Sequence, residues 1–219
     1  MRFHISRAVF LLLAGLAAAQ APSTRDLHLV GDRFKPLTYD QMTPAQKTMT
    51  ENLLGGERGT MSGPFNVLLR SPELGDAVQK VGAQVRYHSS LPPRLNEFAI
   101  IITGRFWNAQ YEWYAHKRLA LQAGLNPAIV DAVAAGRRPT GMQPDEEVVY
   151  NFATELLRTR QVSDAVFNAA REKLGERSVV DLVGVVGYYG LVSMVLNVDR
   201  YPLPAGVQPE LRPVRENHR

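Results

Sequence analysis

The sequence predicts an all-α protein, a compact bundle of about six to eight helices. Apolar residues recur at helical spacing through most of the chain, and no stretch shows sustained apolar–polar alternation with turn signals, as a half-buried strand would. Proline and glycine residues divide the apolar runs into segments joined by short loops, a pattern typical of compact bundles. The chain has no repeat of solenoid length and no internal linker, so we expect one domain.

Residues 1–19 are similar to a secretory signal peptide. Arg2 and Arg7 make the start basic, and Ala8 to Ala19 is apolar, too short to span a bilayer, and ends in small residues suited to cleavage. We therefore expect a secreted or periplasmic protein that has no membrane contact after signal removal. An uncleaved membrane anchor is the alternative.

The first predicted helices follow a polar lead-in segment, residues 20–42, that is rich in Pro and Gly. Thr43-Pro44 is a helix start signal, and Gly55-Gly56 ends the helix that it opens. Ser71-Pro72 then opens a second helix, whose apolar positions lie at helical spacing.

The centre of the chain predicts a helical hairpin. Pro92-Pro93 opens an apolar run at helical spacing, and a further helix follows it and ends at Gly124. If the chain reverses near Phe106 and Trp107, these two helices lie antiparallel.

Start and stop signals also divide the last part of the chain into helices. They predict helices from Asn126-Pro127 to Gly136, from the acidic turn Asp145-Glu146-Glu147 through Leu157, and from Ser163-Asp164 to Gly175. The last helix, Ser178 to Asn197, is apolar nearly all round, so it should be the most buried or lie in a subunit interface. The domain then spans residues 43–204, and a Pro-rich tail, residues 205–219, lies extended on the surface or on a neighbouring subunit.

The hairpin carries the candidate catalytic residues. Glu112 and His116 share one face of the second helix, and a reversal near Trp107 places Glu97 of the first helix opposite His116. A buried carboxylate facing an imidazole is a general acid/base unit, because the carboxylate fixes the ring tautomer and raises its basicity. The alternative is a hydrogen-bonded polar pair in a core.

Composition limits the chemistry. The chain has no cysteine, which excludes thiol chemistry. Removing residues 1–19 takes away two arginines and no acidic residue, so the net charge of +4 becomes +2, too mild for a nucleic-acid surface. Glu97, Glu112 and His116 are alternative metal ligands, but their spacing matches neither di-iron bundles nor zinc helices, so we expect no metal and no cofactor.

Several separated motifs resemble the carboxymuconolactone decarboxylase family. In chain order they are Gly63-Pro64-Phe65, Ser71-Pro72-Glu73-Leu74, Leu91-Pro92-Pro93-Arg94-Leu95-Asn96-Glu97, Trp107-Asn108-Ala109-Gln110-Tyr111-Glu112-Trp113, His116, Gly124-Leu125, Gly187-Tyr188-Tyr189 and Leu196-Asn197. The resemblance implies the all-α fold of alkyl hydroperoxide reductase D (AhpD) for residues 43–204. It also implies a homo-oligomer, a trimer or hexamer. In the AhpD branch two cysteines accompany the histidine and the glutamate; here Ala109 and Glu112 occupy those positions, so the resemblance is to a cysteine-free branch.

The resemblance implies lyase or other lactone-directed acid/base chemistry on a small carboxylated or aromatic-derived substrate. His116 would donate the proton, Glu97 would orient the His116 imidazole, and Glu112 would tune or share the proton. The aromatic residues Trp107 and Tyr111 would line the substrate. Arg105 is a candidate for holding a substrate carboxylate and Asn197 for a site hydrogen bond, although an arginine at a helix end is often only a solvated charge.

An exported location is at odds with the intracellular degradation pathway that gives the family its name, so we expect a changed substrate. The alternative function is an exported, non-catalytic protein that binds a small ligand or assembles on the same fold.

Overall fold

The computed structural model describes residues 26–213. The predicted signal peptide and the last residues of the predicted tail therefore lie outside the described residues. Within the described range the chain forms one 3-10 helix, nine α-helices and no strand, which confirms the all-α prediction. In chain order these are η1 (Tyr39–Gln41), α1 (Pro44–Gly55), α2 (Phe65–Leu68), α3 (Pro72–Tyr87), α4 (Pro93–Phe106), α5 (Gln110–Gln122), α6 (Pro127–Ala134), α7 (Pro144–Thr159), α8 (Asp164–Leu174) and α9 (Glu176–Asp199).

The helix starts follow local capping chemistry. Thr43 accepts a hydrogen bond from the Gln46 amide, and Gln46 Oε1 accepts one from the Thr43 amide, which is a capping box at the start of α1. Asn126 Oδ1 accepts from the Ala128 amide at the start of α6. The start and stop signals predicted eight helices. The described chain has nine α-helices, because the single-turn helix α2 was not predicted.

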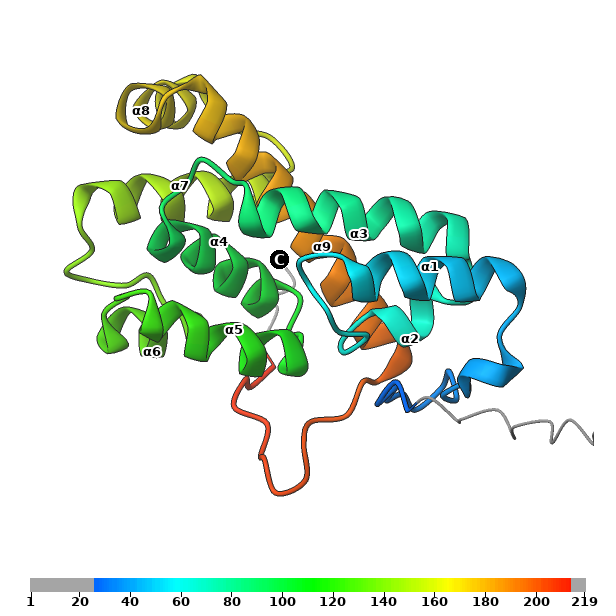
Figure 1. The fold of residues 1–219 in the computed structure, drawn as a ribbon. Coiled ribbons are helices and arrows are strands. Elements are labelled where there is room, and N and C mark those ends of the chain that lie inside the picture. The colour runs from blue at the N-terminus through cyan, green and yellow to red at the C-terminus, as the bar shows by residue number, and fades with distance from the viewer. Residues whose placement is uncertain (1–25, 214–219) are drawn as a thin grey trace, which may run out of the picture.

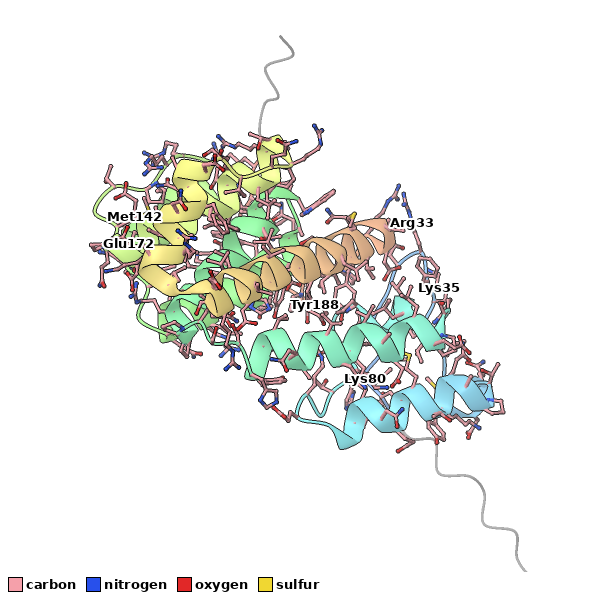
Figure 2. All side chains as sticks on the ribbon, turned by 90° about the horizontal axis from the view of Figure 1, so that it is seen from above. Arg33, Lys35, Lys80, Met142, Glu172 and Tyr188 are labelled. Carbon is pink, nitrogen blue, oxygen red and sulfur yellow. The ribbon has the colours of Figure 1, made fainter. Side chains whose placement is uncertain are left out.

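The helices form two groups that α9 joins. Helices α1, α2 and α3 pack together, and α4 packs against α5, α6 and α7. Helix α9 contacts both groups, through α3 on one side and α4 on the other. Figure 1 shows α4 near the centre, and Figure 2 shows α9, α3 and α1 side by side, with Tyr188 of α9 directed toward α3.

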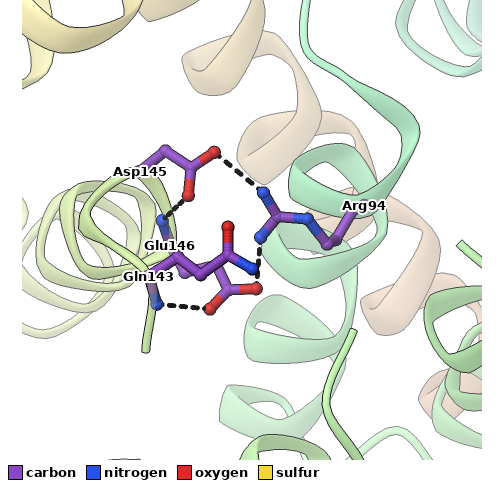
Figure 3. A network of polar contacts seen from close by, with 4 residues as sticks. All are labelled: Arg94, Gln143, Asp145 and Glu146. Atoms are coloured by element: carbon purple, nitrogen blue, oxygen red, sulfur yellow. Dashed lines mark hydrogen bonds and ion pairs between the residues drawn. The ribbon is translucent and has the colours of Figure 1, made fainter. Parts of the chain in front are cut away.

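Helix α4 is the most enclosed element of its group. All of Phe98 to Arg105 is buried, because α5, α7 and α9 cover it on different sides. A charged contact fixes its start: Arg94 pairs with Glu146 and, at 2.8 Å, with Asp145 at the N-terminus of α7 (Figure 3). Glu146 also accepts a hydrogen bond from the Gln143 amide at 2.7 Å, so α4 and the start of α7 form one framework.

Helix α9 buries only part of its apolar surface. It is long and apolar enough to cross a membrane by length and composition, but more than half of that apolar window is buried inside the fold. Val180, Val183, Met194 and Val198 are exposed along the remaining face. The prediction that this helix is buried or lies in an interface therefore holds for one face, and the other face has no cover within the described chain.

The described part of the C-terminal segment lies extended along α5. The Gln110 side-chain amide makes two hydrogen bonds to the Leu211 backbone. It donates to the carbonyl at 2.7 Å and accepts from the amide at 3.1 Å. Glu210 accepts hydrogen bonds from Trp113 at 3.2 Å and Lys117 at 2.5 Å. Leu211 is consequently only 3% exposed.

Candidate functional site

The site depends on the tight reversal between α4 and α5. Asn108 has φ of 49°, in the left-handed region that asparagine tolerates better than most residues, and its Oδ1 accepts a hydrogen bond from Arg105 Nη1 at 2.9 Å. The Ala109 amide donates to the Gly104 carbonyl at 2.9 Å. Asn197 of α9 donates from Nδ2 to the Trp107 carbonyl at 2.8 Å, which anchors the turn to α9.

Glu97, Glu112 and His116 meet as predicted, and we call them the charged triad. His116 Nδ1 lies 2.7 Å from Glu97 Oε2 across the hairpin, and His116 Nε2 lies 3.1 Å from Glu112 Oε1 one turn earlier on α5. The Glu112 and His116 residues are each only 4% exposed. Both ring nitrogens therefore face a carboxylate in a site with little water.

The two carboxylates determine the charge of the ring. Burial of His116 opposes its protonation, but the charge and hydrogen bond of Glu112, followed by those of Glu97, outweigh that cost and raise the His116 pKa to about 9. The ring is therefore an imidazolium at neutral pH, donating one N–H to each carboxylate.

Two tyrosines of α9 cover the charged triad. The Tyr189 ring meets the His116 ring edge to face, with centroids 4.9 Å apart. Burial, together with the nearby Glu112 charge, raises the Tyr189 pKa well above its usual value, so the phenol stays neutral. Tyr188 packs edge to face on Tyr189 and fills the space above Gly82 of α3.

A cavity of about 270 Å³, which we call the triad cavity, opens beside Glu112 and His116. Tyr111, Tyr188 and Tyr189 contribute to its wall. Three arginines from three different segments also line it: Arg58, Arg86 and Arg118. A hollow with two buried acid/base groups and three cationic groups suits a small anion.

The arginines of the triad cavity differ in their partners. Burial disfavours the Arg86 charge, but Tyr189, Tyr87, Glu97 and Glu112 together raise the Arg86 pKa. Arg86 thus helps to balance the two carboxylates. Arg58 donates from Nη2 to the Ser62 carbonyl at 3.0 Å, while its buried Nε has no hydrogen-bond partner.

Of the predicted substrate residues, only Tyr111 lines the triad cavity. Its ring packs against that of Tyr201 at a tilt of 58°, with ring centroids 4.3 Å apart. Burial, together with Tyr201, raises the Tyr111 pKa to about 12, so the phenol stays a neutral hydrogen-bonding group. Arg105 and Trp107 line a different hollow, on the side of α6 and α7. The Asn197 side-chain amide already donates a hydrogen bond to the Trp107 carbonyl.

Sequence reasoning missed Arg58, Arg86, Arg118 and the direct role of Tyr189 as a cover. The pair Tyr188-Tyr189 belongs to one of the motifs that carry the family resemblance, which was the available signal for it. Arg118 lies on α5, the second helix of the hairpin, but nothing in the spacing of Arg58 and Arg86 relates them to the hairpin. Among residues 26–213 no group of three or more His, Asp or Glu side chains is arranged to hold a metal ion.

The family model described as "Carboxymuconolactone decarboxylase family" matches residues 72–155, which contain the whole charged triad. The matched segment makes up less than half of the chain. No curated protein matches the chain. The carboxymuconolactone decarboxylase-like segment contains no cysteine, since the whole chain has none.

Two solved structures share the fold. A protein of unknown function from Agrobacterium tumefaciens, named as a candidate antioxidant defence protein AhpD, is 15% identical with a TM-score of 0.53; the match covers 65% of this chain and 99% of that one. An uncharacterized peroxidase-related protein from Silicibacter sp. TM1040 is 16% identical with a TM-score of 0.58, over 87% of this chain and 96% of that one. At such identity the likeness shows the AhpD-like all-α fold alone.

Proposed function

We propose that this carboxymuconolactone decarboxylase-like protein is an acid/base enzyme, a lyase acting on a small carboxylated lactone or a related aromatic-derived acid. The observation that carries the proposal is the buried imidazolium of His116, held between Glu97 and Glu112 beside an arginine-lined cavity. Thiol peroxidase chemistry is disfavoured because the chain has no cysteine to form a sulfenic acid or a disulfide.

The proposed reaction balances with one proton. The bond between the substrate carbon and its carboxylate breaks, carbon dioxide leaves, and the electron pair delocalises onto the lactone carbonyl as a dienolate. A proton from the charged triad then adds to carbon, and the triad recovers a proton from water. The imidazolium is the proton reservoir, and Glu112, which lines the cavity, passes the proton on. Glu97 does not line the cavity and orients the ring from behind.

Cationic groups would stabilise the charge that develops on the substrate. Arg58 suits the substrate carboxylate, because its buried Nε is unpartnered. Arg86 suits the developing oxyanion, because it lines the cavity together with Glu112 and His116 and its raised pKa keeps it cationic there. Both line the triad cavity, whereas Arg105 does not, so the structure favours them over Arg105 for these roles.

Carbon dioxide release from carboxymuconolactone and related carboxylated lactones tests this proposal. We expect turnover that falls by roughly 100-fold or more in His116→Ala and Glu112→Gln, since general acid/base catalysis contributes that much. His88→Ala is the matched control, because His88 is an exposed histidine that pairs with Glu57 at the surface. Full turnover by folded His116→Ala would refute the assignment.

One observation favours a second candidate function, a non-catalytic binding protein on the same fold. Both His116 nitrogens are already hydrogen-bonded to carboxylates, as in a polar pair that serves only structure. Glu97→Gln separates the two functions. An enzyme should lose turnover, whereas a binder should show only a modest change in ligand affinity and no turnover in either form.

We also propose that the protein is exported. The support is the signal-like composition of residues 1–19. N-terminal sequencing of protein recovered outside the cytoplasm should find a chain that begins near Gln20. Recovery of the full-length chain from the cytoplasm alone would contradict export.

We further propose a homo-oligomer, a trimer or a hexamer, assembled through the exposed face of α9. Val180, Val183 and Val198 are exposed there at 69%, 46% and 53%, a patch that a soluble monomer rarely leaves open. Val183→Asp should shift the mass measured by light scattering to that of a monomer. Val81→Asp, at an exposed valine of α3, is the matched control.

A further inference from the structure

A second cavity lies apart from the charged triad, between α4, α6 and α7. Its volume is about 480 Å³, within the range of small-molecule sites, and it shares no lining residue with the triad cavity. Ile102, Val133 and Leu157 give it apolar walls, and Phe106 and Tyr150 add aromatic rings. We call it the arginine-rimmed cavity, because Arg105, Arg137 and Arg158 also line it.

The charge of this cavity has one sign. Its lining includes three arginines and no acidic residue. None of the three takes part in an ion pair with a residue of the described range 26–213. Clustered arginines without counter-ions raise one another's free energy and attract an anion.

Unpartnered polar atoms gather around the same cavity. Seven buried side-chain atoms lack a hydrogen-bond partner in the described part of the chain, and two of them, Arg105 Nε and Thr154 Oγ1, belong to residues that line this cavity from α4 and α7. A third, Trp107 Nε1, also belongs to a lining residue but lies against Gly190 of α9 instead. Each of these groups can donate a hydrogen bond. Arg105 is only 7% exposed, so its missing partner is not bulk water. Burial also lowers the Arg105 pKa, which a bound anion would offset.

We propose that the arginine-rimmed cavity binds a small aromatic carboxylate, with the ring between the apolar walls and the carboxylate on Arg105. The unpartnered donors favour a ligand with a hydrogen-bond acceptor, and the arginines favour one with a negative charge. The apolar and aromatic walls favour a flat hydrophobic ring. Arg137 and Arg158, both exposed at the rim, steer and retain the anion. This site is additional to the triad cavity and does not depend on the chemistry proposed there.

Calorimetric titration of the full mature chain with naphthoate tests the proposal, with uncharged naphthylmethanol as the comparison ligand. We expect one naphthoate site per chain and at least about tenfold weaker binding of the alcohol. Arg105→Gln should weaken naphthoate binding at least about tenfold, and Arg158→Gln about threefold. Leu157→Trp should also weaken naphthoate binding, because the larger indole takes up part of the cavity.

Control variants separate this site from other sources of affinity. Arg171→Gln removes an equal charge on α8, outside the lining of both cavities, and should leave binding unchanged. Arg118→Gln, in the lining of the triad cavity, should do the same. Because Arg105 also bonds the Asn108 side chain, each variant is first checked for native circular dichroism and melting. Naphthoate binding that is lost in Arg118→Gln, that is unchanged in both Arg105→Gln and Leu157→Trp, or that is absent altogether would overturn the proposal.

Discussion

The charge of His116 gives the sharpest test of the site. Its pKa is raised from the usual 6.5 to about 9 because two carboxylates outweigh the burial of the ring. At 1.36 kcal/mol per pKa unit, this difference corresponds to about 3 kcal/mol in favour of the imidazolium. In Glu112→Gln the strongest favourable interaction is lost while burial remains, so we expect the His116 pKa to fall by at least one unit.

A pH titration of the ring signals by NMR measures this directly, with His116→Ala used to assign the resonance. The wild-type signal should move between pH 8 and 10, centred at about 9. In Glu112→Gln and Glu97→Gln it should move at lower pH, with the larger change in Glu112→Gln. A wild-type midpoint at or below 6.5 would refute the reasoning, because burial would then outweigh both carboxylates.

The same shift predicts how stability depends on pH. Because the pKa of His116 is higher in the folded than in the unfolded chain, its contribution is complete below pH 6.5 and is lost as pH rises through about 9. The free energy of unfolding from urea titrations should therefore fall by about 3 kcal/mol over this interval. His116→Gln, whose side chain does not titrate, should lack this alkaline loss.

Three further predictions concern the framework around the site, each measured by urea denaturation. Arg94→Leu should destabilise the fold by about 3 kcal/mol, because it leaves Glu146 buried without its counter-ion; a loss under 1 kcal/mol would show that α7 does not depend on this pair. Leu211→Ala should cost about 2 kcal/mol, since that side chain is buried against α5, and an unchanged midpoint would mean that the tail detaches freely in solution. Gly82→Ala should cost about 2 kcal/mol, because the new Cβ would lie 2.2 Å from the Tyr188 hydroxyl, and wild-type stability there would indicate that Tyr188 moves aside at no cost.

The meeting of Glu97 and His116 could be predicted because it depends on local signals. Proline at the start of α4, the reversal near Trp107 and the helical period on each side fix which residues of a hairpin face each other. The partnership of Glu112 with the same ring follows from their separation by one helical turn. These contacts need no knowledge of the rest of the fold.

The other parts of the site depend on packing between distant segments. Arg86 and Tyr189 meet at the triad cavity because α3 and α9 lie side by side, and Arg58 reaches it from the loop after α1. Arg105 was a candidate for holding a substrate carboxylate because it lies near the bend of the hairpin. Eight residues at about 100° each turn its side chain about 80° away from that of Glu97, and it faces α6 and α7 instead.

The charged triad also implies an order of events during folding. Its three residues lie within one hairpin, and contacts between residues close in sequence form sooner than those between distant ones. Tyr189, which covers the ring, belongs to the last helix of the chain. The imidazole and carboxylates can therefore pair while they are still hydrated, so that the docking of α9 removes water from groups that already neutralise one another. In this order the folding chain avoids the larger free-energy cost of dehydrating each charge alone.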